Sequence, residues 1–442
     1  MNEWWCEHAW LPPGQVVARV LIGVTDGRIT SIDTDVDQPT SATRLNGLVI
    51  PGLANAHSHA FHRALRGRTQ AGRGDFWSWR DQMYAVANRL DPDSYLALAR
   101  ATYAEMALAG ITCVGEFHYV HHQASGEPYA QPNVMGVALA EAAAQVGVRL
   151  TLLDTCYVAG GIDEPLSDQQ RRFGDGDADG WAARVASVGD LGSHARLGAA
   201  IHSVRAVPAS QLAVVADWAH QRDAPLHFHL SEQPAENDAC RRRYGATPTQ
   251  LLADHGVLGA AAVAVHATHL LDTDIATLGA SSTGVCLCPT TERDLADGIG
   301  PAGALAAARV ALSVGSDGQS VIDLFEEARA IELGVRLATH MRGTFGAAQL
   351  LDAATVAGHR ALGWSDAGVL ATGMRADLVA VDLGSVRTGG GAATAETIVF
   401  AAAAADVTDL VVDGTVVVRD RRHVRIDDVG AALRDAIAPV TA

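Results

Sequence analysis

The feature that most constrains the fold of this chain is a repeated alternation of short apolar strands with alanine-rich helical stretches. Short apolar runs bounded by turn residues favour buried strands, and alternation with helical segments favours parallel pairing. Eight strands alternating with helices is the count of a (β/α)8 TIM-type barrel, an α/β fold. The expected strands are Leu53–Ala56, Thr112–Phe117, Arg149–Asp154, Arg196–Ile201, Leu226–Leu230, Val263–His266, Gly284–Cys288 and Val310–Ser316.

Both ends of the chain have the composition of β-structure. Val16–Gly23 and Arg28–Ile32 read as strands near the start, and Asp409–Val418 contains an Asp-Gly hairpin signal near the end. We therefore expect one small β-sandwich domain built from both termini. The expected divisions are 1–48 and 367–442 for the two parts of this domain and 49–366 for the barrel.

Charge and hydropathy limit the possible partners. The formal net charge of −17 argues against nucleic acid or an anionic membrane, because both select basic surfaces. The N-terminus lacks the pattern of a signal peptide, and no apolar run approaches the roughly 18 residues needed to span a bilayer. The six cysteines form no C-x-x-C pair, and Cys286 and Cys288, which alternate along an apolar strand, read as reduced core residues. We expect a cytoplasmic protein.

Imidazole and carboxylate side chains occur where several predicted strands end. In a (β/α)8 barrel these ends meet at one face, where catalytic residues lie. Residues two apart in a strand point to the same side, so two histidines spaced this way converge. Imidazoles and a carboxylate suit zinc, although they also suit Fe(II), Mn(II) or Co(II). We predict a metal site whose ligands are His57, His59, His229 and Asp317.

Two further residues fit the chemistry of a metal-dependent hydrolase. Glu232 stands three positions after His229, where a carboxylate can take a proton from water beside a metal and deliver it to a leaving amine. His227 shares the face of His229 and is the alternative ligand, but the spacing to Glu232 favours His229. His266, at the end of the sixth strand, is the candidate for orienting the attacking water, and Asp317 can also accept a proton from it.

These pieces, in this strand order, resemble the amidohydrolase superfamily over essentially the whole chain. Many members hold two metals bridged by a carboxylated lysine, but this chain contains no Lys, and all 33 basic residues are Arg. The arrangement of His229 and Glu232 is instead similar to the single-zinc deaminase branch, in which water attacks a C=N carbon and ammonia leaves. The resemblance implies one zinc ion per subunit and a homodimer.

Within that branch the chain is similar to the family of N-formimino-L-glutamate deiminases. The resemblance implies hydrolysis of N-formimino-L-glutamate, a small anionic amino-acid derivative, to N-formyl-L-glutamate and ammonia in histidine degradation. The stretches that carry it are His57–Leu65, Phe76–Tyr84, Glu116–His122, His202–Ala206 and Leu295–Ile299.

A substrate with two carboxylates needs planar, permanently charged donors, and Arg80 and Arg205 are the candidates. Tyr119 and His202 can add hydrogen bonds. His62 stands where some members of the family carry Gln, which leaves the exact substrate open. The alternative for Arg80 is a surface cation packed on the rings of Trp77 and Trp79.

Two other functions remain open at this point. A guanine- or cytosine-type nucleobase deaminase would use the same scaffold but would need aromatic stacking and amide donors in place of two arginines. A barrel without catalysis that serves as a scaffold is the alternative from another class. Such proteins usually lose metal ligands, whereas the full predicted set is present here.

Overall fold

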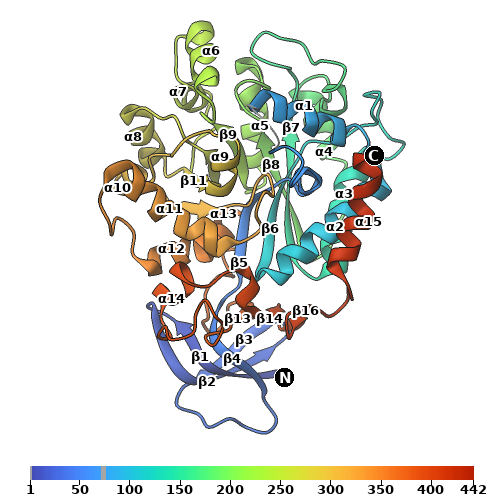
Figure 1. Cartoon of the computed structure of the whole chain (residues 1–442). Coiled ribbons are helices and arrows are strands. Elements are labelled where there is room, and N and C mark those ends of the chain that lie inside the picture. The colour runs from blue at the N-terminus through green and yellow to red at the C-terminus, as the bar shows by residue number, and fades with distance from the viewer. Residues whose placement is uncertain (1, 71–75) are drawn as a thin grey trace.

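The eight predicted barrel strands all form, and they pair in parallel in the order β12-β11-β10-β9-β8-β7-β6-β5. The structure is a computed structural model that describes residues 2–70 and 76–442 (Figure 1). A parallel bridge between Ser58 and Asp317 brings the first and last strands together, so the barrel is nearly closed. The barrel fold is thereby confirmed. The strands are β5 (Leu53–Ser58), β6 (Ile111–His118), β7 (Arg149–Cys156), β8 (Ala195–Ile201), β9 (Leu226–Leu230), β10 (Ala262–His266), β11 (Gly284–Leu287) and β12 (Leu312–Val314).

Helices connect the strands and form the outer layer. α2 begins with a capping box between Asp91 and Ser94, and α3 ends where Gly147 takes a left-handed backbone with φ of 93°. The helices are α1 (Phe76–Ala87), α2 (Pro92–Leu108), α3 (Val134–Val146), α4 (Ala178–Val185), α5 (Ala209–His220), α6 (Pro234–Tyr244), α7 (Pro248–Asp254), α8 (Asp272–Ser281), α9 (Pro289–Asp294), α10 (Ala302–Ala307), α11 (Leu324–Thr339), α12 (Ala347–Ala354), α13 (Val356–Ala361), α14 (Ala395–Phe400) and α15 (Val429–Thr441).

A second sheet contains strands from both ends of the chain, in the order β16-β15-β14-β13-β4-β1-β2-β3. The two ends join where β13 pairs antiparallel with β4, so that Leu378 lies opposite Pro51. This arrangement confirms a separate β-structure built from both termini. The strands are β1 (Asn2–Leu11), β2 (Gln15–Thr25), β3 (Arg28–Asp33), β4 (Thr43–Pro51), β13 (Leu378–Val381), β14 (Val407–Val412), β15 (Thr415–Arg419) and β16 (Arg422–His423).

The C-terminal helix α15 leaves this sheet and returns to the barrel. It packs against α2, as Figure 1 shows for the red and cyan helices. Its buried residues include Leu433 and Val440, which form the apolar face that makes this contact favourable. The segment that the sequence assigns to the small domain therefore contributes one helix to the outer layer of the barrel.

Two expectations from the composition can be compared with the structure. Each of the six cysteines is buried and unpaired, in agreement with reduced core residues. Among the helices of the described chain, none is long and apolar enough to cross a membrane.

Candidate active site

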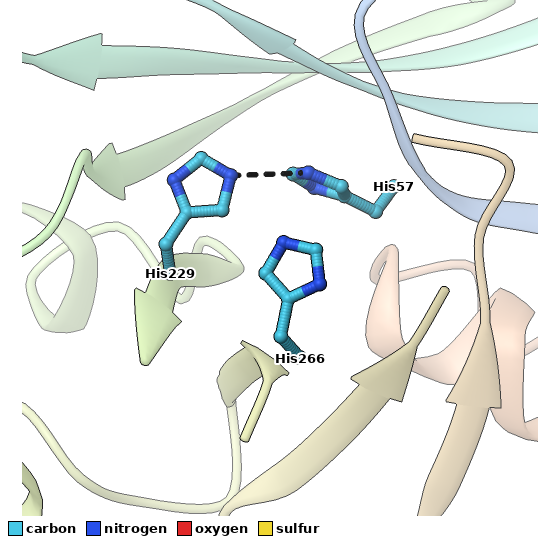
Figure 2. Close-up of side chains that lie close together, drawn as sticks. All are labelled: His57, His229 and His266. Carbon is cyan, nitrogen blue, oxygen red and sulfur yellow. Dashed lines mark hydrogen bonds between the residues drawn. The ribbon is translucent and has the colours of Figure 1, made fainter. Parts of the chain in front are cut away.

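The four predicted metal ligands converge at the carboxyl ends of the barrel strands, and all four are buried. The Nε2 atoms of His57 and His59 lie 3.3 and 3.4 Å from Oδ1 of Asp317. The Nε2 atom of His229 lies 3.2 Å from that of His57, and Figure 2 shows this contact as a dashed line, with His266 beside it. Ligand atoms from β5, β9 and the loop after β12 thus surround one point.

Hydrogen bonds behind the rings leave acceptor nitrogens pointing to this centre. Nδ1 of His59 lies 2.9 Å from the carbonyl oxygen of Phe117, and Nδ1 of His229 lies 2.8 Å from that of His202. An Nδ1–H that donates to a carbonyl leaves the lone pair on Nε2, which is the form that binds a metal. Burial also lowers the pKa of both rings well below the usual value, so they are neutral. The donor set therefore fits a divalent cation.

Asp317 supplies the negative charge of the cluster. Burial acts to raise the pKa of Asp317, but its hydrogen bond to His57 and its electrostatic interaction with the imidazoles of His57, His266 and His59 outweigh that effect, and the pKa lies well below the usual range. The backbone at Asp317 has φ of 40°, which is uncommon for a residue other than glycine. Two bonds hold this conformation: Asp317 N donates to His57 O, and His59 N donates to Asp317 O.

Glu232 and His266 border the cluster. Oε1 of Glu232 and Oδ2 of Asp317 each lie 3.8 Å from Nε2 of His266. On the other side, Nδ1 of His266 lies 3.5 Å from Oε1 of Glu292. Burial acts to lower the pKa of His266, but the charges of Glu232, Glu292 and Asp317 outweigh it and raise the pKa to about 10.

Arg205 connects Glu232 to a second carboxylate. Its Nη2 atom lies 3.1 Å from Oε2 of Glu232, and its Nε atom lies 3.3 Å from Oε2 of Glu236. Burial acts to lower the pKa of Arg205, but the charges of Glu236 and Glu232 outweigh it and raise the pKa above the usual value. Glu236 and Glu292 are not among the residues predicted from the sequence. Glu236 stands four positions after Glu232, in the first turn of α6, and Glu292 follows the end of the seventh barrel strand, so both positions had a signal in the sequence.

A cavity of about 510 Å³ opens above the cluster. Its wall includes Trp79, Arg80 and Met83 from α1, and the Arg80 guanidinium lies 5.5 Å from the centre of the Tyr84 ring. The alternative contact of Arg80 with Trp77 falls on a side chain outside the described residues. The five predicted substrate-binding residues all line this cavity: His62, Arg80, Tyr119, His202 and Arg205.

His227, the alternative ligand, and other histidines near the site take part in other contacts. Nε2 of His227 lies 2.9 Å from the carbonyl oxygen of Ala361, and Nε2 of His269 lies 2.8 Å from the carbonyl oxygen of Asp297. Another group behind the site contains His118, His121 and Asp154. Both oxygens of Asp154 already accept bonds from Arg184, which makes this group an ion-pair network rather than a second metal site.

Comparison with known proteins places the chain among relatives of the same architecture. The Amidohydrolase family matches residues 48–417. The chain is 36% identical to formimidoylglutamate deiminase of Pseudomonas aeruginosa, with 96% of each protein covered. It is 28% identical to 5-methylthioadenosine/S-adenosylhomocysteine deaminase of Haloarcula marismortui, with 91% of this chain and 89% of that protein covered. The crystal structure of an amidohydrolase from Brucella melitensis superimposes with a TM-score of 0.93 at 33% identity, and all of both chains is covered.

Proposed function

This chain belongs to the amidohydrolase family, and from that premise we propose that it hydrolyses N-formimino-L-glutamate to N-formyl-L-glutamate and ammonia. One observation carries the proposal beyond the family. A single cavity holds the His and Asp cluster at its base and both Arg80 and Arg205 in its wall. This combination fits a substrate that presents a C=N carbon to the metal and carboxylates to the arginines. The relative that is 36% identical bears a name for the same reaction.

We further propose one zinc ion held by His57, His59, His229 and Asp317. Three neutral imidazoles and one carboxylate match the ligand types that zinc accepts. When bound, the ion supplies Lewis acidity that makes water a stronger nucleophile near neutral pH.

The side chains around this position move the protons of the reaction. Glu232 takes a proton from the attacking water and passes it to the imino nitrogen, which gives an adduct that carries a hydroxyl and an amino group. When the C–N bond breaks, the hydroxyl proton follows to the same nitrogen, which leaves as ammonia while the carbon becomes a formyl group. Nε2 of His266 and Oδ2 of Asp317 lie 3.8 Å apart, close enough for one water oxygen to contact both, and in this proposal they orient that water and stabilise the adduct.

Arg80 and Arg205 bind the two carboxylates of the substrate in this proposal, with His62, Tyr119 and His202 as hydrogen-bonding partners. Nε2 of His62 lies 3.1 Å from the Tyr119 hydroxyl, so the two residues form one polar unit of the wall. A nucleobase deaminase remains the second candidate, because aromatic rings such as Trp79, Tyr119 and Phe173 also line the cavity. The arginines favour the dicarboxylate.

The test is ammonia release by zinc-loaded protein from N-formimino-L-glutamate, N-formimino-L-aspartate, guanine and cytosine. A strong preference for the glutamate compound supports both the reaction and the two-carboxylate site. Turnover of a nucleobase above the formimino compounds would contradict the substrate and retain the metal chemistry. No ammonia from any of them, in protein that binds zinc, would overturn the proposed function.

A homodimer is part of the same proposal. Leu333 and Leu337 stand one turn apart on the outer face of α11 and, with Ile299, line a shallow apolar depression, while Met341 follows at the end of the stripe. Two copies packed antiparallel along this stripe would bury these side chains. The acidic first turn of each α11, with Glu326, would then lie near the basic last turn of the other α11, with Arg336.

A further inference from the structure

Arg205 lies between the carboxylates of Glu232 and Glu236, and one of them is held more firmly than the other. Glu236 has a fully buried side chain, and its Oε1 accepts a bond of 3.1 Å from the backbone N–H of Ser231. Glu232 is also an ion-pair partner of Arg205 and is nearly as buried, but it lines the cavity, its other oxygen reaches toward His266, and its carboxylate accepts from the described residues no backbone bond like the one that holds Glu236. Glu236 is therefore the anchored partner of Arg205, and Glu232 is the partner that can exchange.

The ion pair between Arg205 and Glu232 conflicts with the two functions proposed above. A guanidinium that donates to Glu232 has fewer donors for a substrate carboxylate. Equally, the bond from Arg205 to Oε2 of Glu232 holds this carboxylate with only Oε1 toward His266, and it restrains the turn by which Glu232 would carry a proton from the water to the imino nitrogen. One event resolves both conflicts, because an arriving carboxylate competes with Glu232 for the same donor.

We propose that a carboxylate of the substrate displaces Glu232 from Arg205, and that the released Glu232 then turns to the reacting atoms while Glu236 keeps Arg205 in place. Arg205 is thus a specificity-determining residue, and Glu236 is a positioning residue that acts through it. The inference rests on the proposed function, in which the substrate brings a carboxylate to Arg205. Its consequence is that this carboxylate promotes the chemical step as well as binding.

The first experiment uses the wild-type zinc enzyme and two substrates that each lack one carboxylate. N-formimino-4-aminobutyrate lacks the α-carboxylate, and N-formimino-L-2-aminobutyrate lacks the γ-carboxylate. We expect one of them to lose roughly tenfold or more in kcat at saturation, because Glu232 stays paired, while the other mainly raises KM. Added formate or acetate should restore part of the lost kcat by occupying the vacant position at Arg205.

The result that overturns the inference is an increase of KM alone for both compounds, with kcat kept and no effect of added carboxylate. This outcome differs from failure of the proposed function, in which N-formimino-L-glutamate itself gives no ammonia. Because the measurement uses unaltered protein, it does not depend on the folding of a variant.

The second experiment tests the anchor with Glu236→Gln. An amide oxygen can still accept the Ser231 N–H bond, but the charge that holds Arg205 is lost, so Glu232 becomes the main carboxylate partner of Arg205. We expect a lower kcat for N-formimino-L-glutamate, by roughly tenfold, at unchanged zinc content. The matched control is Glu327→Gln, which alters a buried glutamate that accepts bonds from Thr290 outside the cavity. Equal kcat values in Glu236→Gln, the control and the wild type would contradict the anchoring role.

Discussion

We expect Glu232→Gln to lower kcat by about 10³–10⁴-fold, the upper part of the range for loss of a general base, while the metal stays bound. In activation free energy this is about 4–5 kcal/mol. The upper part applies because neighbouring carboxylates cannot take over the role. Asp317 belongs to the metal cluster, and Glu236 is held by Arg205 and Ser231. Metal binding should persist because the cluster atoms all come from other residues.

The assay combines ammonia release from N-formimino-L-glutamate with metal analysis of the same preparation. Glutamine can still accept a bond from Arg205, so the melting temperature should stay close to that of the wild type. Glu164→Gln, which changes an exposed glutamate at the rim of the cavity, is the matched control and should retain activity. A kcat for Glu232→Gln within about threefold of the wild-type value, with a full complement of metal, would refute the assignment of Glu232 as the proton carrier.

Removal of the metal with a chelator should abolish ammonia release and lower the melting temperature, because a ligand that binds only the folded state stabilises it. Added zinc should restore both the activity and the melting temperature. Unchanged activity in metal-free protein would argue against a metal enzyme. Burial acts to raise the pKa of Asp154, but the ion pair with Arg184 outweighs this effect and lowers the pKa to about 2. The ionised Asp154 therefore stabilises the folded state above the ordinary pKa of the carboxyl, and this stabilisation is lost as the pH falls from about 4 to 2. In urea titrations at pH 6, we expect the free energy of unfolding of Asp154→Asn to be about 2 kcal/mol lower than that of the wild type. This difference should shrink toward pH 3, and a difference that stays constant with pH would contradict the linkage. Leu337→Arg should convert a dimer to a monomer in light scattering, whereas Val386→Arg, at an exposed apolar residue elsewhere, should not; dimers in both variants would exclude the α11 stripe.

The barrel and the convergence of the candidate metal ligands could be predicted from the sequence because their signals are local. Each strand is a short apolar run, and His57, His59, His229 and Asp317 lie at or just beyond strand ends. A parallel barrel brings such ends to one face whatever the loops do. The positions of these side chains therefore followed from strand order alone.

The contacts among loops and helices were not accessible in the same way. Pairing of Arg205 with Glu236 depends on how the loop after β8 meets α6, and the bond of Glu292 to His266 depends on where α9 begins. Packing of α15 on the barrel also depends on the path of the chain after β16. The spacing of residues in the sequence specifies the periodicity within a helix or strand, but it carries little information on the contacts between different elements.

The pairing of β4 with β13 has a consequence for synthesis in the cell. Six of the nine residues of β4 are buried in the finished protein, yet its partner β13 is made roughly 330 residues later, which at ~5–20 residues/s takes roughly 15–65 s. Throughout that interval one edge of the N-terminal sheet presents unpaired backbone groups beside apolar side chains, which is a hazard for aggregation. A chain whose synthesis stops after the barrel but before β13 would therefore have a largely complete barrel and an unpaired, aggregation-prone edge at β4. Such a product would need chaperones or proteolysis.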